Sequence, residues 1–74
     1  MARLPNLKVK KLLATLKRAG FVEYDQEGSH LYLWHPIKDI TTSVPVHGGE
    51  INRSLMKLII KQAGLSEDEF RKFL

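Results

Sequence analysis

Apolar residues recur three or four positions apart in two stretches of the chain, residues 7–19 and residues 53–63. This spacing gathers them on one face of a helix and predicts an amphipathic helix in each stretch. A glycine, Gly20 or Gly64, follows each stretch, and glycine often ends a helix in the left-handed conformation. Asn52 precedes the second stretch and is a suitable N-cap.

Between these two helices the apolar positions alternate with polar ones, as they do in strands. Strands are expected over residues 21–26, 29–35 and 40–46. In the middle strand Leu31 and Leu33 would share one face, and the opposite face would carry His30, Tyr32 and Trp34. Pro45 has no backbone N–H to donate, which predicts that the third strand lies at an edge of the sheet near its end.

The predicted element order is α-β-β-β-α, with a short C-terminal helix over residues 67–74 that a capping-box pattern of Ser66 and Glu69 introduces. A three-stranded antiparallel sheet needs an apolar face that is covered. Two helices on one face give a two-layer α+β domain, and a single domain is expected over residues 1–74. Double-stranded-RNA-binding domains share this order, although the order alone assigns no function.

The composition is that of an ordinary globular protein, with 43% hydrophobic and 27% charged residues. The chain contains no cysteine, so it has no disulfide and no thiolate metal site, which fits a reducing cytosol. No apolar run approaches the roughly 20 residues of a membrane span, and lysines interrupt the leucines near the N-terminus, where a signal peptide needs an apolar core. We therefore expect a cytoplasmic protein with no membrane partner.

Positive charge is concentrated in the first part of the chain. Residues 1–20 carry six basic side chains and no acidic one, whereas residues 21–40 sum to −3 and residues 41–74 to +1. This asymmetry favours a polyanion or an acidic protein as partner. Four basic residues on the polar face of the first helix are candidate RNA-binding residues: Lys10, Lys11, Lys17 and Arg18. A solvated helix face explains the same residues equally well.

Gly28, Ser29 and His30 stand where the second strand begins. A tight turn at Glu27-Gly28 requires a positive φ, which glycine adopts without strain. Such a turn would hold the imidazole of His30 rigidly while leaving it exposed, and Ser29 would close the turn or donate to a phosphate. Histidine titrates near physiological pH, so His30 is a candidate general acid or base, although a lone histidine is more often structural.

Two other histidines could supply a second proton-transfer group. His47 is the better candidate because it stands at a strand end beside two glycines, and His35 comes next. Either could instead be structural, and three scattered histidines without cysteine do not form a metal-ligand pattern. Tyr32 and Trp34 could stack on unpaired bases, or be buried against a partner or beneath the last helix.

Four segments, in this order and spacing, carry a likeness to a known family: KRAGF at residues 17–21, GSH at 28–30, TSVPVH at 42–47 and LIIKQAGLS at 58–66. They resemble the HicA toxins, small ribonucleases of toxin–antitoxin modules. The resemblance implies a double-stranded-RNA-binding-like fold, cleavage of messenger RNA, and neutralisation by a HicB-type antitoxin in a hetero-oligomer. It also implies that His30 is the catalytic histidine and that Gly28 is the signature glycine.

RNA carries its own nucleophile, the 2′-hydroxyl, so a ribonuclease needs only proton transfer and stabilisation of negative charge. The chain offers a histidine and lysines but no carboxylate cluster suited to magnesium. We therefore expect an endoribonuclease that works without a metal or other cofactor.

Two non-catalytic interpretations remain open. The first is an RNA-binding module, although double-stranded-RNA binders usually have a lysine cluster at the start of the final helix, where this chain has Asn52-Arg53-Ser54. The second is an adaptor that uses the apolar excess on the second long helix, including Leu58. A catalytic role of His30 distinguishes the enzyme from both.

Overall fold

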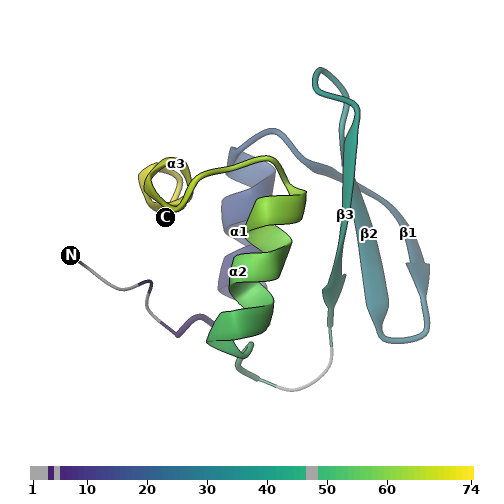
Figure 1. Cartoon of the computed structure of the whole chain (residues 1–74). Helices are drawn as coiled ribbons and strands as arrows, with labels where there is room; N and C mark the ends of the chain where they lie inside the picture. The colour runs from purple at the N-terminus through teal and green to yellow at the C-terminus, as the bar shows by residue number, and fades with distance from the viewer. Residues whose placement is uncertain (1–3, 5, 47–48) are drawn as a thin grey trace.

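The computed structural model describes residue 4, residues 6–46 and residues 49–74 of the chain (Figure 1). Its elements are α1 Val9–Arg18, β1 Val22–Glu27, β2 His30–His35, β3 Ile40–Pro45, α2 Arg53–Gln62 and α3 Glu67–Lys72. The strands form one antiparallel sheet in the order β1-β2-β3. The predicted α+β architecture is therefore confirmed, and β3 is an edge strand, as Pro45 indicated.

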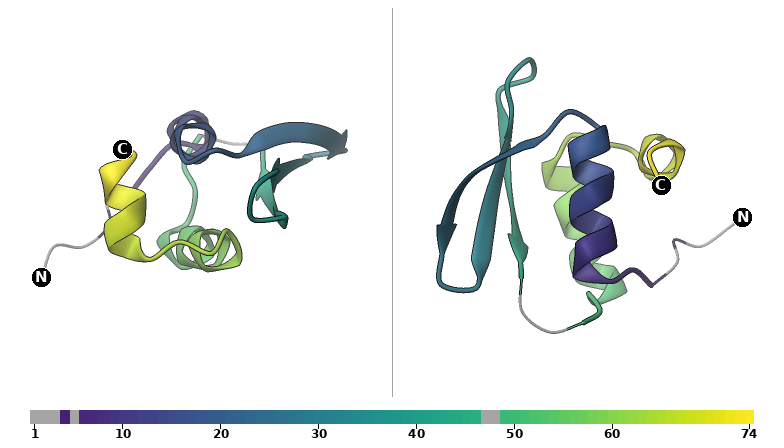
Figure 2. Two further views of the ribbon diagram at one scale, coloured as in Figure 1. Left: turned by 90° about the horizontal axis from the view of Figure 1, so that it is seen from above. Right: turned by 180° about the vertical axis from the view of Figure 1, so that it is seen from behind.

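The two long helices lie side by side on one face of the sheet, and α3 lies on the far side of this pair from the sheet (Figure 2). The two long helices cover β2 and β3, where alternate residues are buried or partly buried. They do not cover β1, whose six residues are all exposed. The opposite face of the sheet is open, so its side chains are available to a ligand.

The amphipathic patterns of α1 and α2 become buried stripes, with Leu12 and Leu16 fully buried on α1 and Met56 on α2. The stripes meet Leu33 of β2 in one core, which Phe70 of α3 closes at the far side with no exposed surface. Burial of such side chains contributes about 1.5–3 kcal/mol each.

Gly20 ends α1 as predicted, with φ of +108°. Its N–H donates to the carbonyl of Lys17 at 3.0 Å, and the N–H of Phe21 donates to the carbonyl of Leu16 at 3.1 Å. This is a Schellman arrangement, and the same pattern ends α2 at Gly64. A Cβ atom built on Gly20 would lie 2.6 Å from Nε2 of His35, so this position requires glycine for space as well as for conformation.

The first helix begins later than residues 7–19 predicted. Lys8, just before α1, is extended and pairs with Glu50 in an isolated antiparallel bridge, with N–H donation from Val9 to the Gly49 carbonyl and from Ile51 to the Leu7 carbonyl, both at 3.0 Å. Leu7 is apolar because it is buried in this extended pairing, and not because it belongs to the helix that the sequence pattern predicted.

The hairpin between β1 and β2 differs in detail from the prediction. Glu27 pairs with His30, so the turn is Gly28-Ser29 rather than Glu27-Gly28, and β2 begins one residue later than expected. A bulge at Tyr24 interrupts the pairing of β1 with β2. Neither difference moves His30 from the start of the strand.

We expect Gly20→Ala to destabilise the domain more than Gly28→Ala. Both glycines have positive φ, which costs a side-chain-bearing residue about 1–2 kcal/mol, but a Cβ at Gly28 would meet nothing within 4 Å. At Gly20 the displacement of His35 adds to that cost. Urea denaturation of both variants measures the difference, and equal losses would contradict the packing argument.

The capping box of α3 makes stability depend on pH. The backbone N–H of Ser66 donates to the Glu69 carboxylate at 3.0 Å and, with the Ser66 hydroxyl, lowers the pKa of Glu69 below its usual 4.5. Folding therefore favours the charged carboxylate of Glu69. The stability that this carboxylate contributes is complete above its usual pKa of 4.5 and is lost as pH falls through the lowered pKa of the folded state. Wild type should melt at a higher temperature than Glu69→Gln at about pH 6, and the gap should narrow as pH falls below 4.5 and through the lowered pKa of Glu69. A gap that persists in acid would argue against this assignment.

Candidate active site on the open face of the sheet

His30 is exposed on the sheet face that points away from the helices, at the first position of β2. Gly28 has φ of +58° and Ser29 does not have a positive φ, which is the sign pattern of a type II′ hairpin turn. The N–H of Val46, just after β3, donates to the Ser29 carbonyl at 2.7 Å. The turn is thus held from both neighbouring strands, and the backbone of His30 is fixed while its ring is accessible.

Three rows of side chains cross this open face, each centred on β2. They are Glu27, His30 and Pro45; Asp25, Tyr32 and Ser43; and Val22, Trp34 and Thr41. Directly opposed residues in such rows have Cβ atoms about 4.5–5.5 Å apart. The first two rows are acidic at their β1 end, and every row is uncharged at its β3 end.

Two aromatic side chains continue the line of His30 along β2. Trp34 is 36% exposed, and its indole N–H donates to Oδ1 of Asp39 at 2.8 Å. Tyr32 is half-buried, with its ring centroid 6.2 Å from that of Tyr24. The expectation that Trp34 could be buried beneath the last helix is wrong, because Trp34 is on the sheet face that the helices do not cover. Stacking on bases and contact with a partner remain open.

His35 lies on the opposite face and is only 7% exposed. Its Nδ1 accepts the N–H of Lys38 at 3.1 Å, which leaves the proton on Nε2 to donate to the Ala19 carbonyl at 3.2 Å. The ring also meets Phe21 edge-on, with centroids 5.2 Å apart. Of its two interpretations, the structural one is therefore correct, and His35 is not available to a substrate on the open face.

His47, the candidate second acid or base, lies outside the described residues. Its role remains a prediction.

The four predicted RNA-binding cations are all exposed on α1, but they differ in their partners. Lys17 forms an ion pair with Glu23 of β1. Arg18 donates from Nη1 to the Phe73 carbonyl at 2.8 Å, which ties α1 to the residue after α3. Lys10 and Lys11 form no ion pair with a described residue, so they are the members of the set most available to an anion.

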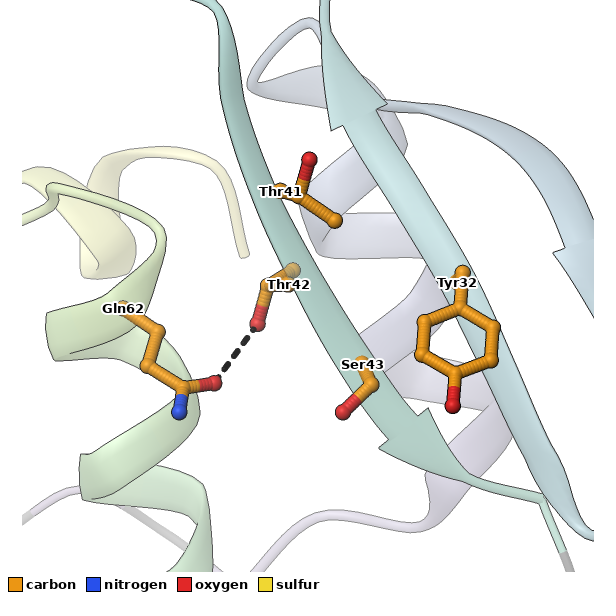
Figure 3. A pocket seen from close by; sticks show the side chains of 5 residues that line it. All are labelled: Tyr32, Thr41, Thr42, Ser43 and Gln62. Carbon is orange, nitrogen blue, oxygen red and sulfur yellow. Dashed lines mark hydrogen bonds between the residues drawn. The ribbon is translucent and has the colours of Figure 1, made fainter.

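A shallow pocket of about 320 Å³ lies at the outer edge of β3 and reaches the open face. Figure 3 shows Gln62 extending from α2 toward Thr42, whose hydroxyl donates to Oε1 of Gln62 at 3.3 Å. Tyr32, Thr41 and Ser43 complete the lining. The pocket offers hydroxyl groups and one amide but no acid–base pair, and nothing in the sequence pattern singled out Gln62.

Within the described residues, no group of three or more His, Cys, Asp or Glu side chains could hold a metal ion. No helix in that part of the chain is long and apolar enough to cross a membrane.

Comparison with known protein families matches residues 9–65 to the model described as the HicA toxin of bacterial toxin–antitoxin systems. The class of protein that this match defines is the toxin of a toxin–antitoxin system, which acts beside an antitoxin. Because the match covers about three quarters of the 74 residues, the chain belongs to the HicA toxin family. None of the curated proteins compared with the chain matches it.

The two described histidines should respond differently to truncation. His35→Ala would leave the Ala19 carbonyl and the Lys38 N–H without their partner and open a cavity, at a cost of about 2–4 kcal/mol. His30→Ala removes an exposed side chain and should change the free energy of unfolding by less than about 0.5 kcal/mol. Chemical denaturation tests both, and a large loss with His30→Ala would mean that His30 is structural.

Proposed function

We propose that this chain is an endoribonuclease that cleaves messenger RNA with His30 as its catalytic residue, and that a HicB-type antitoxin neutralises it in a hetero-oligomer. The observation that carries the proposal is the position of His30. This chain belongs to the HicA family, and the histidine of its GSH segment, His30, is exposed on the open face of the sheet while its backbone is paired with both neighbouring strands.

The proposed reaction uses the substrate's own 2′-hydroxyl. A base removes its proton, the oxygen attacks the adjacent phosphorus, the bond from phosphorus to the 5′-oxygen breaks, and an acid protonates that leaving oxygen. His30 acts as the base or the acid, and His47 is proposed as the second group. We propose that this reaction needs no metal, because a histidine and lysines can supply the proton transfer and the charge stabilisation.

Single-stranded RNA is the substrate that the open face fits best. Tyr32 and Trp34 continue the line of His30, and base stacking on an aromatic side chain is worth about 1–3 kcal/mol per base. We propose Lys10 and Lys11 as phosphate contacts, and Lys17 and Arg18 as contacts that would exchange their present partners for phosphate.

A non-catalytic binder of double-stranded RNA receives less support. Such domains grip phosphates with cations at the start of the last long helix. Here Nε of Arg53 donates to the Leu4 carbonyl at 3.0 Å, so part of the only guanidinium at that position is already engaged within the domain.

An exposed apolar pair on α2 is consistent with an antitoxin partner. Leu55 and Leu58 are 38% and 58% exposed on the side of the helix away from the core. An adaptor would use the same surface, so the pair supports a protein partner without distinguishing the two roles.

The decisive test compares wild type, His30→Ala and Val22→Ala, a control that truncates an exposed side chain on the β1 side of the same sheet face. Purified wild type and the control should cleave a short unstructured RNA, and His30→Ala should lower the rate about 10²- to 10⁴-fold. Induced expression should arrest growth and shorten transcripts with wild type and the control only.

The same assay examines the remaining roles. Cleavage should persist in EDTA, and His47→Ala should slow it if His47 transfers the second proton. Strict dependence on added divalent ions would overturn the metal-independent mechanism. Undiminished cleavage by His30→Ala would overturn the central role of His30.

A further inference from the structure

A second pocket, of about 360 Å³, lies between α1 and the chain that leaves β3. We refer to it as the α1–β3 pocket. Its described lining consists of Lys8, Val9, Lys10, Leu13, Val46 and Gly49. His30 is not among these described residues.

The lining combines an apolar floor with two cations. Val9 is buried, and Leu13 and Val46 are half-buried, so together they present a hydrocarbon surface. Lys8 and Lys10 are exposed, and neither forms an ion pair with a described carboxylate. A ligand with a flat apolar part and a negative charge fits this combination. A nucleotide has both, since its base is flat and its phosphate is negatively charged.

Backbone contacts connect the pocket to His30. Val46 lines the pocket, and its N–H donates to the carbonyl of Ser29, the residue before His30. The neighbouring residue, Pro45, is directly opposite His30 in the sheet. Consecutive Cα atoms are about 3.8 Å apart, so one step along the chain leads from the row of His30 to the pocket wall.

Charge selects the direction that an RNA strand would take from His30. Toward β1 it would meet the carboxylates of Glu27 and Asp25, which repel phosphate. Toward β3 the neighbours of His30 and Tyr32 are the uncharged Pro45 and Ser43. Beyond that strand end lie Lys8 and Lys10 of the pocket, neither of which forms an ion pair with a described carboxylate.

We propose that the α1–β3 pocket is a nucleotide subsite, in which one base of single-stranded RNA lies on the apolar floor while Lys8 and Lys10 bind the flanking phosphates. The inference rests on the proposed function for its choice of ligand. It adds a position at which the RNA is held beyond the cleaved bond, around the end of the sheet.

The test measures binding of a mixed-sequence RNA hexamer whose 2′-O-methyl groups prevent cleavage. Lys8→Ala/Lys10→Ala should bind it about tenfold more weakly than wild type, the loss expected for two exposed ion pairs. The slope of log affinity against log salt concentration should fall by about 1.4, since each phosphate contact with a single strand contributes about 0.7. Lys57→Ala/Lys61→Ala removes the same charge from exposed positions on α2, outside the pocket, and should leave both quantities close to wild type.

Amide NMR of the full chain locates the hexamer independently of these variants. The largest shifts should include Val9, Leu13, Val46 and Gly49. Equal losses in the two double variants, no hexamer binding by wild type, or shifts that avoid these amides would each overturn the subsite. A hexaglutamate peptide that shifts these amides when the RNA does not would replace the nucleotide with an acidic protein segment.

Cleavage of the unmodified hexamer separates this inference from the function on which it rests. Cleavage that requires His30 but is unaffected in Lys8→Ala/Lys10→Ala would overturn the subsite and leave the nuclease. Hexamer binding in the pocket without cleavage by wild type would support the subsite and overturn the nuclease.

Discussion

The two-residue period of the central strand β2 is the constraint on which the rest of the structure depends. β2 is paired on both sides, so it cannot rotate to exchange its faces. Leu31 and Leu33 must therefore enter the core beneath the helices, and the same register exposes His30, Tyr32 and Trp34 on the other side. Alternate residues of one strand therefore stabilise the core and form the proposed site.

A second contact fixes how the helices meet this strand. His35, the last residue of β2, accepts from the Lys38 N–H and donates to the carbonyl of Ala19 at the end of α1. The ring lies so close to Gly20 that no side chain fits there. One histidine of β2 therefore joins the helix end to the sheet, while the histidine at the other end of the strand is left accessible.

Charge is separated in space as well as in sequence. The carboxylates of β1 flank one side of β2, and Lys17 at the end of α1 is paired with Glu23 among them. The lysines near the start of α1 lie toward the end of β3, where the α1–β3 pocket opens. In the proposed subsite, this separation of charge would direct an anionic polymer on the open face around one end of the sheet, from His30 toward the α1–β3 pocket.

The sequence by itself determined the elements, their order, the faces of β2 and the glycine ends of the helices, because these follow from contacts a few residues apart. It also singled out His30, although only the family likeness favoured a catalytic role over a structural one. Tertiary structure decided the rest. His35 is structural because Ala19 and Lys38 meet it in space, Arg18 is engaged by a carbonyl 55 residues away, and Leu7 is buried in an extended pairing that mimicked a helical pattern. Lys8 drew no attention in the sequence, since the pocket it lines forms only when α1 and the end of β3 come together.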